Sequence, residues 1–317
     1  MLREPRNQQP CYIRPVTGKE PEDSLTNVSD GTTDVSVLTP SYRYGRFITD
    51  SIESVIGQRG VHLQHIVQDA GSDDETLDVL RSFGDRVEWT SEHDRGQSDG
   101  LNKALSKANG EWVAWLNADE YYLPDGLQVL VEAGERTNAD VVYGDCVTVD
   151  REGRMTGLRP QHPFSSLILR LYGPFVASVS VIIRRSALDE RPWDPSLRFV
   201  MDWDLYLRLA SMGASFRYVP YPVGAFREHA DQVSAGPGTP ETRDVRHRHR
   251  IPSARWYRKG GKALHGLRKL AAGSYGRQRR ATVFEGLDLR WFDDPASAEN
   301  VRALLDRCYG LSMRVDE

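Results

Sequence analysis

Cysteines, long apolar runs and secretory features are what this sequence has little of. Its 317 residues contain three cysteines, Cys11, Cys146 and Cys308, which are odd in number and far apart. This excludes a disulfide scaffold and argues against a cysteine-ligated zinc site. The longest apolar run, 176–183, is interrupted by two serines and is too short to span a bilayer. No apolar stretch follows the charged N-terminus, so we expect a soluble, cytoplasmic protein of a reducing compartment.

The usual glycine-rich nucleotide motifs are also missing. No GxGxxG follows the first expected strand, and Gly261-Lys262 lacks both the upstream glycine and the Ser or Thr of a phosphate-binding loop. The sequence therefore does not indicate a dehydrogenase or a P-loop ATPase. A zinc protease is likewise not indicated, because HExxH is absent.

Charge is unevenly distributed along the chain. The formal net charge is -4, which does not favour a nucleic-acid partner. Residues 241–280 nevertheless contain thirteen Lys or Arg residues against Glu241 and Asp244, a local charge of +11, so the rest of the chain carries -15. We expect an acidic body with a basic extension.

Hydrophobic spacing predicts alternating strands and helices from residue 34 onward. Residues 1–33 show no periodicity and are predicted to be a tail or an arm. The expected strands are 34–40, 63–69, 87–91, 111–116 and 140–143, and the expected helices are 46–58, 75–83, 98–109 and one beginning at Pro124. Such alternation is typical of parallel βαβ units, hence an α/β fold. The second half is less regular, with expected strands at 178–183 and 216–219, and helices at 202–212 and near 296–307.

Carboxylates follow three successive strands of this pattern. Asp69 ends the second strand, Asp94 follows the third, and Asp119 with Glu120 follows the fourth. Because ligands bind at the carboxyl ends of strands in an open α/β sheet, these side chains are expected in one crevice. Hard oxygen ligands suit Mg²⁺ or Mn²⁺, which usually also hold substrate phosphates.

Six sequence elements, in this order and spacing, resemble those of family 2 glycosyltransferases of the GT-A type. They are TPSY at 39–42, QDAGSDDET at 68–76, EHDRGQSDGLNK at 92–103, GEWVAWLNADE at 110–120, MDWDLYLRLA at 201–210 and FREH at 226–229. The resemblance implies a Rossmann-like, mixed and mostly parallel sheet with helices on both faces. It also implies a domain at 34–235, with a donor half at 34–126 and an acceptor half at 127–235, before a basic, mainly helical extension at 236–317.

The resemblance assigns roles residue by residue. It places a nucleotide-sugar donor against Thr39, Ser41, Tyr42, Asp69, Asp94, Arg95, Asn117, Ala118 and Asp119. The segment 117–119 stands where a DxD element holds Mn²⁺ or Mg²⁺ on the donor diphosphate. Since Asn117 removes one carboxylate, metal binding without the donor is expected to be weak.

The same resemblance extends to the second half. Asp119, Glu120 and His229 are the implied metal ligands, and Arg227 lies on the diphosphate or acceptor side. Asp202 matches the catalytic base. Trp203 is expected to form an apolar wall for a sugar on the diphosphate or acceptor side.

Several of these residues have simpler interpretations that the sequence leaves open. Asp69 could serve a turn, Asp119 could cap the turn before Pro124, and Asp202 could be the N-cap of its helix. His229 could be structural or solvated. The basic residues 243–280 could contact an anionic membrane at the inner face of the cell, or form a solvated face, a helical lid or a contact between copies.

The expected activity is metal-assisted transfer of a sugar from a nucleoside-diphosphate sugar to an acceptor hydroxyl with inversion. The acceptor, whether glycan, lipid carrier or small molecule, is not readable from the sequence. The alternatives are a retaining transferase on the same fold and a nucleotide-sugar-binding protein without turnover.

Overall fold

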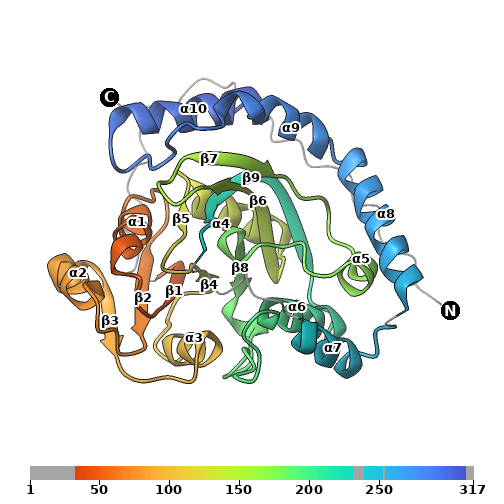
Figure 1. Ribbon diagram of the computed structural model, residues 1–317, viewed down its shortest axis with the longest axis horizontal. Helices are drawn as coiled ribbons and strands as arrows, with labels where there is room; N and C mark the ends of the chain where they lie inside the picture. Colours follow the sequence, from red (N-terminus) through yellow and green to blue (C-terminus); the bar gives the residue numbers. More distant parts are fainter. Residues whose placement is uncertain (1–32, 231–238, 253, 312–317) are drawn as a thin grey trace. The chain divides into compact units, whose positions relative to one another are not determined.

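The computed structural model describes residues 33–230, 239–252 and 254–311 (Figure 1). The expected tail at 1–33 lies outside the described residues except for Thr33. The described residues form one compact unit. The expected α/β fold is confirmed: a mixed sheet is covered by helices on both faces.

The sheet joins a parallel part to a mixed part. Its order is β3-β2-β1-β4-β8-β6-β9-β5, with β7 paired to β6. The pairs β1–β2, β1–β4, β2–β3 and β6–β9 are parallel, whereas β8 runs antiparallel to both β4 and β6. The strands are β1 (Val35–Ser41), β2 (Leu63–Asp69), β3 (Glu88–Ser91), β4 (Trp112–Trp115), β5 (Tyr121–Tyr122), β6 (Val141–Val149), β7 (Met155–Arg159), β8 (Val181–Arg184) and β9 (Phe216–Arg227).

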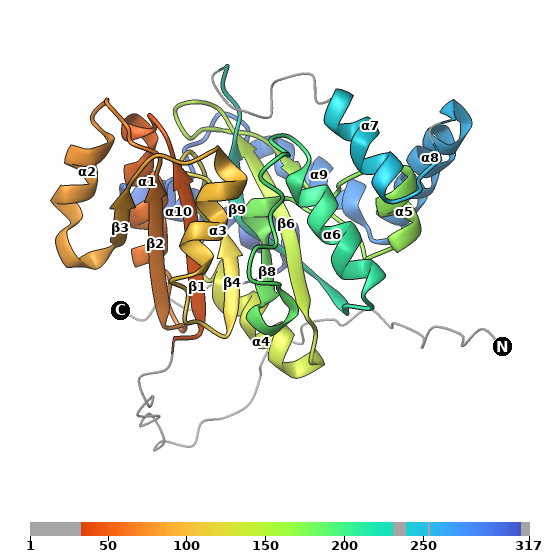
Figure 2. The same cartoon turned by 90° about the horizontal axis from the view of Figure 1, so that it is seen from below.

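Helices pack on the two faces according to the alternation of the strand residues. In β1, Val35 and Val37 contribute to one core cluster and Leu38 to another. The first cluster includes α4 and α10, and the second includes α3, α5 and α6 (Figure 2). The helices are α1 (Gly45–Ile56), α2 (Thr76–Phe83), α3 (Gln97–Leu105), α4 (Gly126–Thr137), α5 (Ser166–Leu171), α6 (Met201–Ser211), α7 (Thr239–Arg248), α8 (Arg255–Ala271), α9 (Ser274–Ala281) and α10 (Pro295–Tyr309).

The C-terminal helices are integrated into this unit. Asp204 of α6, which is 1% exposed, accepts hydrogen bonds from Arg208 and from Arg248 and His249 at the end of α7. Asp145 of β6 is likewise paired with Arg277 of α9. The extension is therefore helical, as expected, and buried ion pairs hold it to the domain. In the part of the chain that the structure describes, no helix is both long and apolar enough to cross a bilayer.

Candidate active site

The end of β1 offers one buried hydroxyl that has no hydrogen-bond partner among the described residues. Ser41 is 5% exposed, and its Oγ is unpaired. Thr39 does not fit the expected donor contact, because its buried hydroxyl lies 2.9 Å from Nε2 of His65. Burial lowers the pKa of His65 to about 3, so this pair is neutral inside the sheet. Tyr42, by contrast, is half exposed beyond the strand.

Asp69 makes the contacts that a turn-forming carboxylate would make. It is fully buried, and its oxygens accept bonds from the backbone N–H groups of Gly71 and Ser72 and from the hydroxyls of Ser72 and Ser91. Ser41 faces Asp69 in the register of β1 and β2. The Asp69 turn and the end of β1 therefore lie next to each other, and the Ser41 hydroxyl there is unpaired among the described residues.

Asp94 and Arg95 lie in the segment before α3. Asp94 accepts a bond from the N–H of Gly96, and a Cβ built on Gly100 would come within 2.9 Å of its second oxygen. Burial raises the pKa of the Asp94 carboxyl. Arg95 is exposed and pairs with Asp99 at 3.0 Å. Both side chains lie at the same end of the sheet as Asp69, since Asp69 pairs with Ser91 in β3.

The segment after β4 is held by hydrogen bonds from its neighbours. Oδ1 of Asn117 accepts from Nε2 of Gln97 at 2.6 Å and from the indole N–H of Trp115. Ala118 is buried in the core, so its side chain cannot contact a donor. Burial, and next the adjacent Asp119 carboxylate, raise the pKa of Glu120, which favours its neutral form and weakens its expected role as an anionic metal ligand.

Asp119 and His229 meet although they are distant in sequence. Oδ2 of Asp119 lies 2.9 Å from Nε2 of His229, and both side chains are less than a tenth exposed. This carboxylate oxygen and imidazole nitrogen fit a divalent ion such as Mn²⁺. Within the described residues no group of three or more His, Cys, Asp or Glu side chains could hold a metal. Asp119 and His229 would therefore hold an ion jointly with other ligands, such as a diphosphate.

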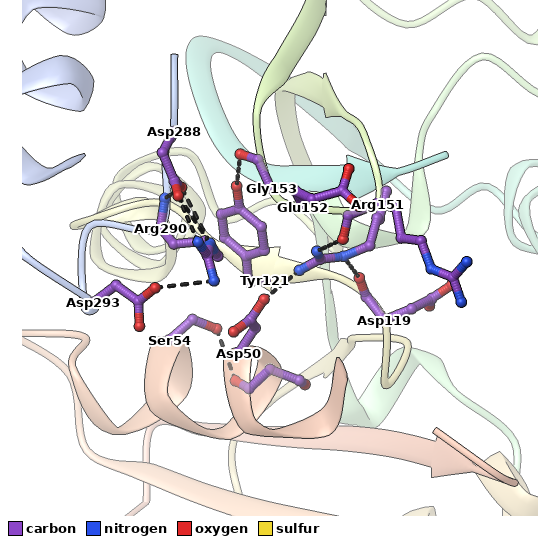
Figure 3. Close-up of polar contacts among 12 residues, drawn as sticks. Asp50, Ser54, Asp119, Tyr121, Arg151, Glu152, Gly153, Asp288, Arg290 and Asp293 are labelled. Atoms are coloured by element: carbon purple, nitrogen blue, oxygen red, sulfur yellow. Dashed lines mark hydrogen bonds and ion pairs between the residues drawn. The ribbon is translucent and has the colours of Figure 1, made fainter. Parts of the chain in front are cut away.

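Arg227 supports the Asp119 segment through hydrogen bonds of its buried guanidinium. Its guanidinium donates to the carbonyl oxygens of Asp119 and Arg151 and, at 2.5 Å, to the carboxylate of Asp50 in α1 (Figure 3). It is 2% exposed, and its guanidinium carbon lies 5.0 Å from the Phe47 ring centroid and 5.5 Å from that of Tyr121. The expected contact with a diphosphate is thus replaced by a buried structural role.

Asp202 lies in the first turn of α6, but it is not the N-cap, which is Val200. Its Oδ1 accepts from the N–H of Trp203, and nothing within the described residues bonds to Oδ2. Burial raises the pKa of Asp202 to about 6. Trp203 is 1% exposed and donates its indole N–H to the carbonyl of Leu169. The expectation that its ring forms a wall for a sugar is wrong, because the ring belongs to the core.

A chain of contacts links the start of α6 to the segment after β4. Gln97 and Ser98 begin α3; Gln97 bonds to Asn117, and the hydroxyl of Ser98 donates to the sulfur of Met201. Helices α3 and α6 lie on the same face of the sheet (Figure 2). The base candidate and the segment 117–120 therefore approach the same end of the sheet from neighbouring elements.

Residues 96–100 read G-x-S-x-G, the spacing of a hydrolase nucleophile, but this serine is structural. Ser98 is 2% exposed, and its hydroxyl also lies 2.9 Å from the carbonyl oxygen of Leu197. A nucleophile on that motif stands exposed at a sharp strand-to-helix turn. The geometry of Ser98 excludes that role.

Sequence reasoning missed Asp50 and Tyr206. Asp50 lies in the middle of the amphipathic helix α1, and only the fold reveals Arg227 as its partner. The Tyr206 hydroxyl is buried and has no hydrogen-bond partner among the described residues; burial, and next the Asp202 carboxylate, raise its pKa. The i, i+4 spacing of Asp202 and Tyr206 on one helix face is a signal that could have found it.

Comparisons with known proteins agree with this geometry. A family described as glycosyl transferase family 2 matches residues 36–191. A PGL/p-HBAD biosynthesis glycosyltransferase of Mycobacterium bovis (strain BCG / Pasteur 1173P2) is 28% identical over 201 residues, which are 61% of this chain and 76% of the relative. An uncharacterized glycosyltransferase of Nostoc sp. is 27% identical over 175 residues, covering 51% and 54% of the two chains.

Solved structures share the fold. TarS 1-349 of S. aureus in complex with UDP-GlcNAc has a TM-score of 0.57 at 18% identity, covering 88% of this chain and 84% of that one. The mannosyltransferase PcManGT from Pyrobaculum calidifontis, in complex with GDP-Man and Mn²⁺, has a TM-score of 0.51 at 19% identity, covering 77% and 76%. The fold, the matched residues and the relatives together show that the chain belongs to glycosyl transferase family 2.

Proposed function

We propose that this glycosyltransferase moves a sugar from a nucleoside-diphosphate donor to an acceptor hydroxyl with inversion, and that Asp202 is the general base. The observation that carries the proposal is the placement of Asp202 on α6. Its Oδ2 lacks a hydrogen-bond partner among the described residues, and α3 links it to the segment 117–120. A nucleotide-sugar donor is supported by the complexes of TarS with UDP-GlcNAc and of PcManGT with GDP-Man.

In the proposed reaction the acceptor oxygen attacks the anomeric carbon as the bond to the diphosphate breaks. Inversion requires the attack to come from the face opposite the diphosphate. Asp202 takes the hydroxyl proton on Oδ2, which makes the oxygen a better nucleophile. A divalent ion held by Asp119 and His229 would supply charge neutralisation for the departing diphosphate.

Screening nucleotide sugars for binding tests the proposed function. Thermal shifts against UDP-, GDP- and dTDP-sugars with Mn²⁺ identify the donor, and product stereochemistry then distinguishes inversion from retention. Donor binding with neither hydrolysis nor transfer to any acceptor would instead identify a nucleotide-sugar-binding protein without turnover.

Substitutions at the ends of β1 and β2 separate donor contact from turn formation. Ser41→Ala should leave stability unchanged, because its Oγ has no partner within the described residues, and should weaken donor binding by about 1 kcal/mol. Asp69→Ala strands several buried donors, so it should lower stability and weaken donor binding by about 1–3 kcal/mol. Calorimetry with the bare nucleotide and urea unfolding measure the two effects. Unchanged affinity in both variants would show that neither side chain touches the donor.

Metal removal tests Asp119. EDTA should abolish transfer without unfolding the protein, and Asp119→Asn should mimic it with a loss of about 10²-fold or more, because one neutral oxygen replaces the anionic ligand. Asp78→Asn, at an exposed position, is the control. Transfer assays with and without Mn²⁺, alongside circular dichroism, give the result. Full activity of Asp119→Asn in EDTA would refute a metal at this position.

A further inference from the structure

Helix α8 uses one face to pack on α5. Gly261 lies so close that a Cβ there would come within 2.6 Å of the carbonyl carbon of Leu171 and 2.7 Å of the nitrogen of Tyr172. One turn later, His265 stacks on the Tyr172 ring with centroids 4.2 Å apart and bonds to His162 at 2.9 Å. The orientation of the helix is therefore determined by close packing along this side.

The opposite side of α8 carries an exposed apolar row. We call Trp256, Gly260, Ala263, Leu267 and Leu270 the α8 stripe; their spacing of four, three, four and three residues places them on one helix face. Trp256, Leu267 and Leu270 are 63–65% exposed, although side chains of this kind are normally buried. The described residues thus leave a continuous apolar stripe facing outward along the whole helix.

Exposed basic side chains also lie on α8: Lys259 and Lys262 are next to Gly260 and Ala263 of the stripe, whereas Arg268, seven residues after Gly261, is on the packed side. Arg258, Lys259, Lys262 and Arg268 are exposed, and no described carboxylate forms an ion pair with them. Twelve Lys or Arg residues and no Asp or Glu occur between Asp244 and Glu285. Arg248 and Arg277 of this set pair with Asp204 and Asp145 of the domain, whereas the exposed cations of α8 have no such partner among the described residues.

We propose that the α8 stripe is a docking surface for an anionic lipid bilayer. The helix lies along the interface, with Trp256, Leu267 and Leu270 among the acyl chains and the Lys and Arg side chains on the phosphates. A basic amphipathic helix with Trp and Leu on its apolar face binds lipid in this way. The proposal is independent of the glycosyl transfer reaction, because none of these residues lies in the candidate active site.

Two other occupants fit the stripe less well. A nucleic acid would use the cations but has no need of an outward row of Trp and Leu side chains. A second copy of α8 would bring two unneutralised basic surfaces together, which like-charge repulsion disfavours. An anionic bilayer accommodates both features at once.

Vesicle co-sedimentation tests the proposal. The full-length protein should bind vesicles of phosphatidylcholine with phosphatidylglycerol at low salt, and bind pure phosphatidylcholine vesicles much more weakly. The triple variant Trp256→Ala, Leu267→Ala, Leu270→Ala should lose about 10²-fold in partitioning, because the insertion of apolar side chains is removed. Lys259→Gln with Lys262→Gln should weaken vesicle binding and reduce its salt dependence.

Matched controls make the outcome decisive. Met212→Ala removes an equally exposed apolar side chain, and Arg136→Gln an exposed cation, and both should bind vesicles as the wild type does. The stripe variants should retain donor binding, so that a failed membrane test and a failed enzymatic proposal are distinguishable. Absence of vesicle binding at low salt, or equal binding by the triple variant, would overturn the proposal. The proposal would also be overturned if the wild type were a dimer that does not bind vesicles and the triple variant were a monomer.

Discussion

Asp202→Asn should reduce kcat by about two orders of magnitude or more while the protein stays folded and binds its donor with unchanged affinity. Asparagine has the same shape and can still accept from the N–H of Trp203, but it cannot take a proton from the acceptor. Because no N-cap bond depends on it, the start of α6 is unaffected. Steady-state kinetics and donor calorimetry measure the two properties separately.

The pKa of Asp202 gives this prediction a pH dependence. Since burial raises it to about 6, the base is ionised only above that pH, and wild-type kcat/KM should fall as pH drops below about 6. The raised pKa also means that ionisation opposes folding: the stability contribution is complete below the unfolded pKa and is lost as pH rises through about 6. At neutral pH, Asp202→Asn should therefore be at least as stable as the wild type.

Asp204→Asn is the internal control, two residues away on the same helix. Burial opposes its ionisation, but hydrogen bonds from His249 and Arg208 outweigh burial and lower its pKa. Its removal should loosen α7 and reduce the melting temperature, with kcat nearly unchanged in the folded fraction. If the Asp202 variant turns over normally, or a well-folded Asp204 variant is inactive, the base has been assigned to the wrong carboxylate.

Arg227→Met should lower the free energy of unfolding by about 3–5 kcal/mol. The substitution leaves Asp50 without its 2.5 Å partner, and the carbonyls of Asp119 and Arg151 lose buried donors. The Asp50 pKa is already raised by burial, which Arg227 partly offsets, so the carboxyl should protonate in the variant. Urea unfolding measures the loss, and Mn²⁺-dependent donor binding should also weaken because the Asp119 segment loses its support.

Two further variants isolate the buried pair. Asp50→Asn added to Arg227→Met should recover part of the lost stability, because it removes the stranded carboxyl. Arg290 lies beside Asp50 and pairs with Asp288 and Asp293, but it is about a quarter exposed (Figure 3). Arg290→Met should therefore reduce stability by only about 1 kcal/mol or less. Equal losses in the two Arg variants would contradict the distinction between buried and exposed pairs.

Local patterns in the sequence predicted the elements of the first half of the chain well. Strand 63–69 and helix 75–83 correspond to β2 and α2, because apolar spacing and neighbouring turns decide these elements. The predicted strand 216–219 is shorter than the observed one, because β9 continues through Pro220 and Pro222 to Arg227. Prolines usually indicate the end of a strand, but the pairing of β6 with β9 shifts register around Asp145, which accommodates them.

The candidate site was predicted less completely, since a motif names residues but not the direction of their side chains. Asp119 and His229 do meet, and Asp202 is positioned at the start of its helix. Trp203 and Arg227 instead point into the interior, where an aromatic ring and a paired guanidinium both pack. Only long-range packing separates a cleft residue from a core residue at such positions.

The position of β9 has a consequence for the order of folding. Its partners are far away in sequence: Phe216 pairs with Val141 of β6, and Ala225 with Tyr121 of β5. Strands β1, β2 and β3 pair with near neighbours and can form early, whereas closing such long loops is slow. Because β9 ends in Arg227 and is followed by His229, the Asp119 segment acquires both partners only when this strand docks. A chain emerging from the ribosome would thus pair β1, β2 and β3 before Asp119 has both Arg227 and His229 as partners. Any ligand that needs Asp119 and His229 together could bind only after β9 has docked.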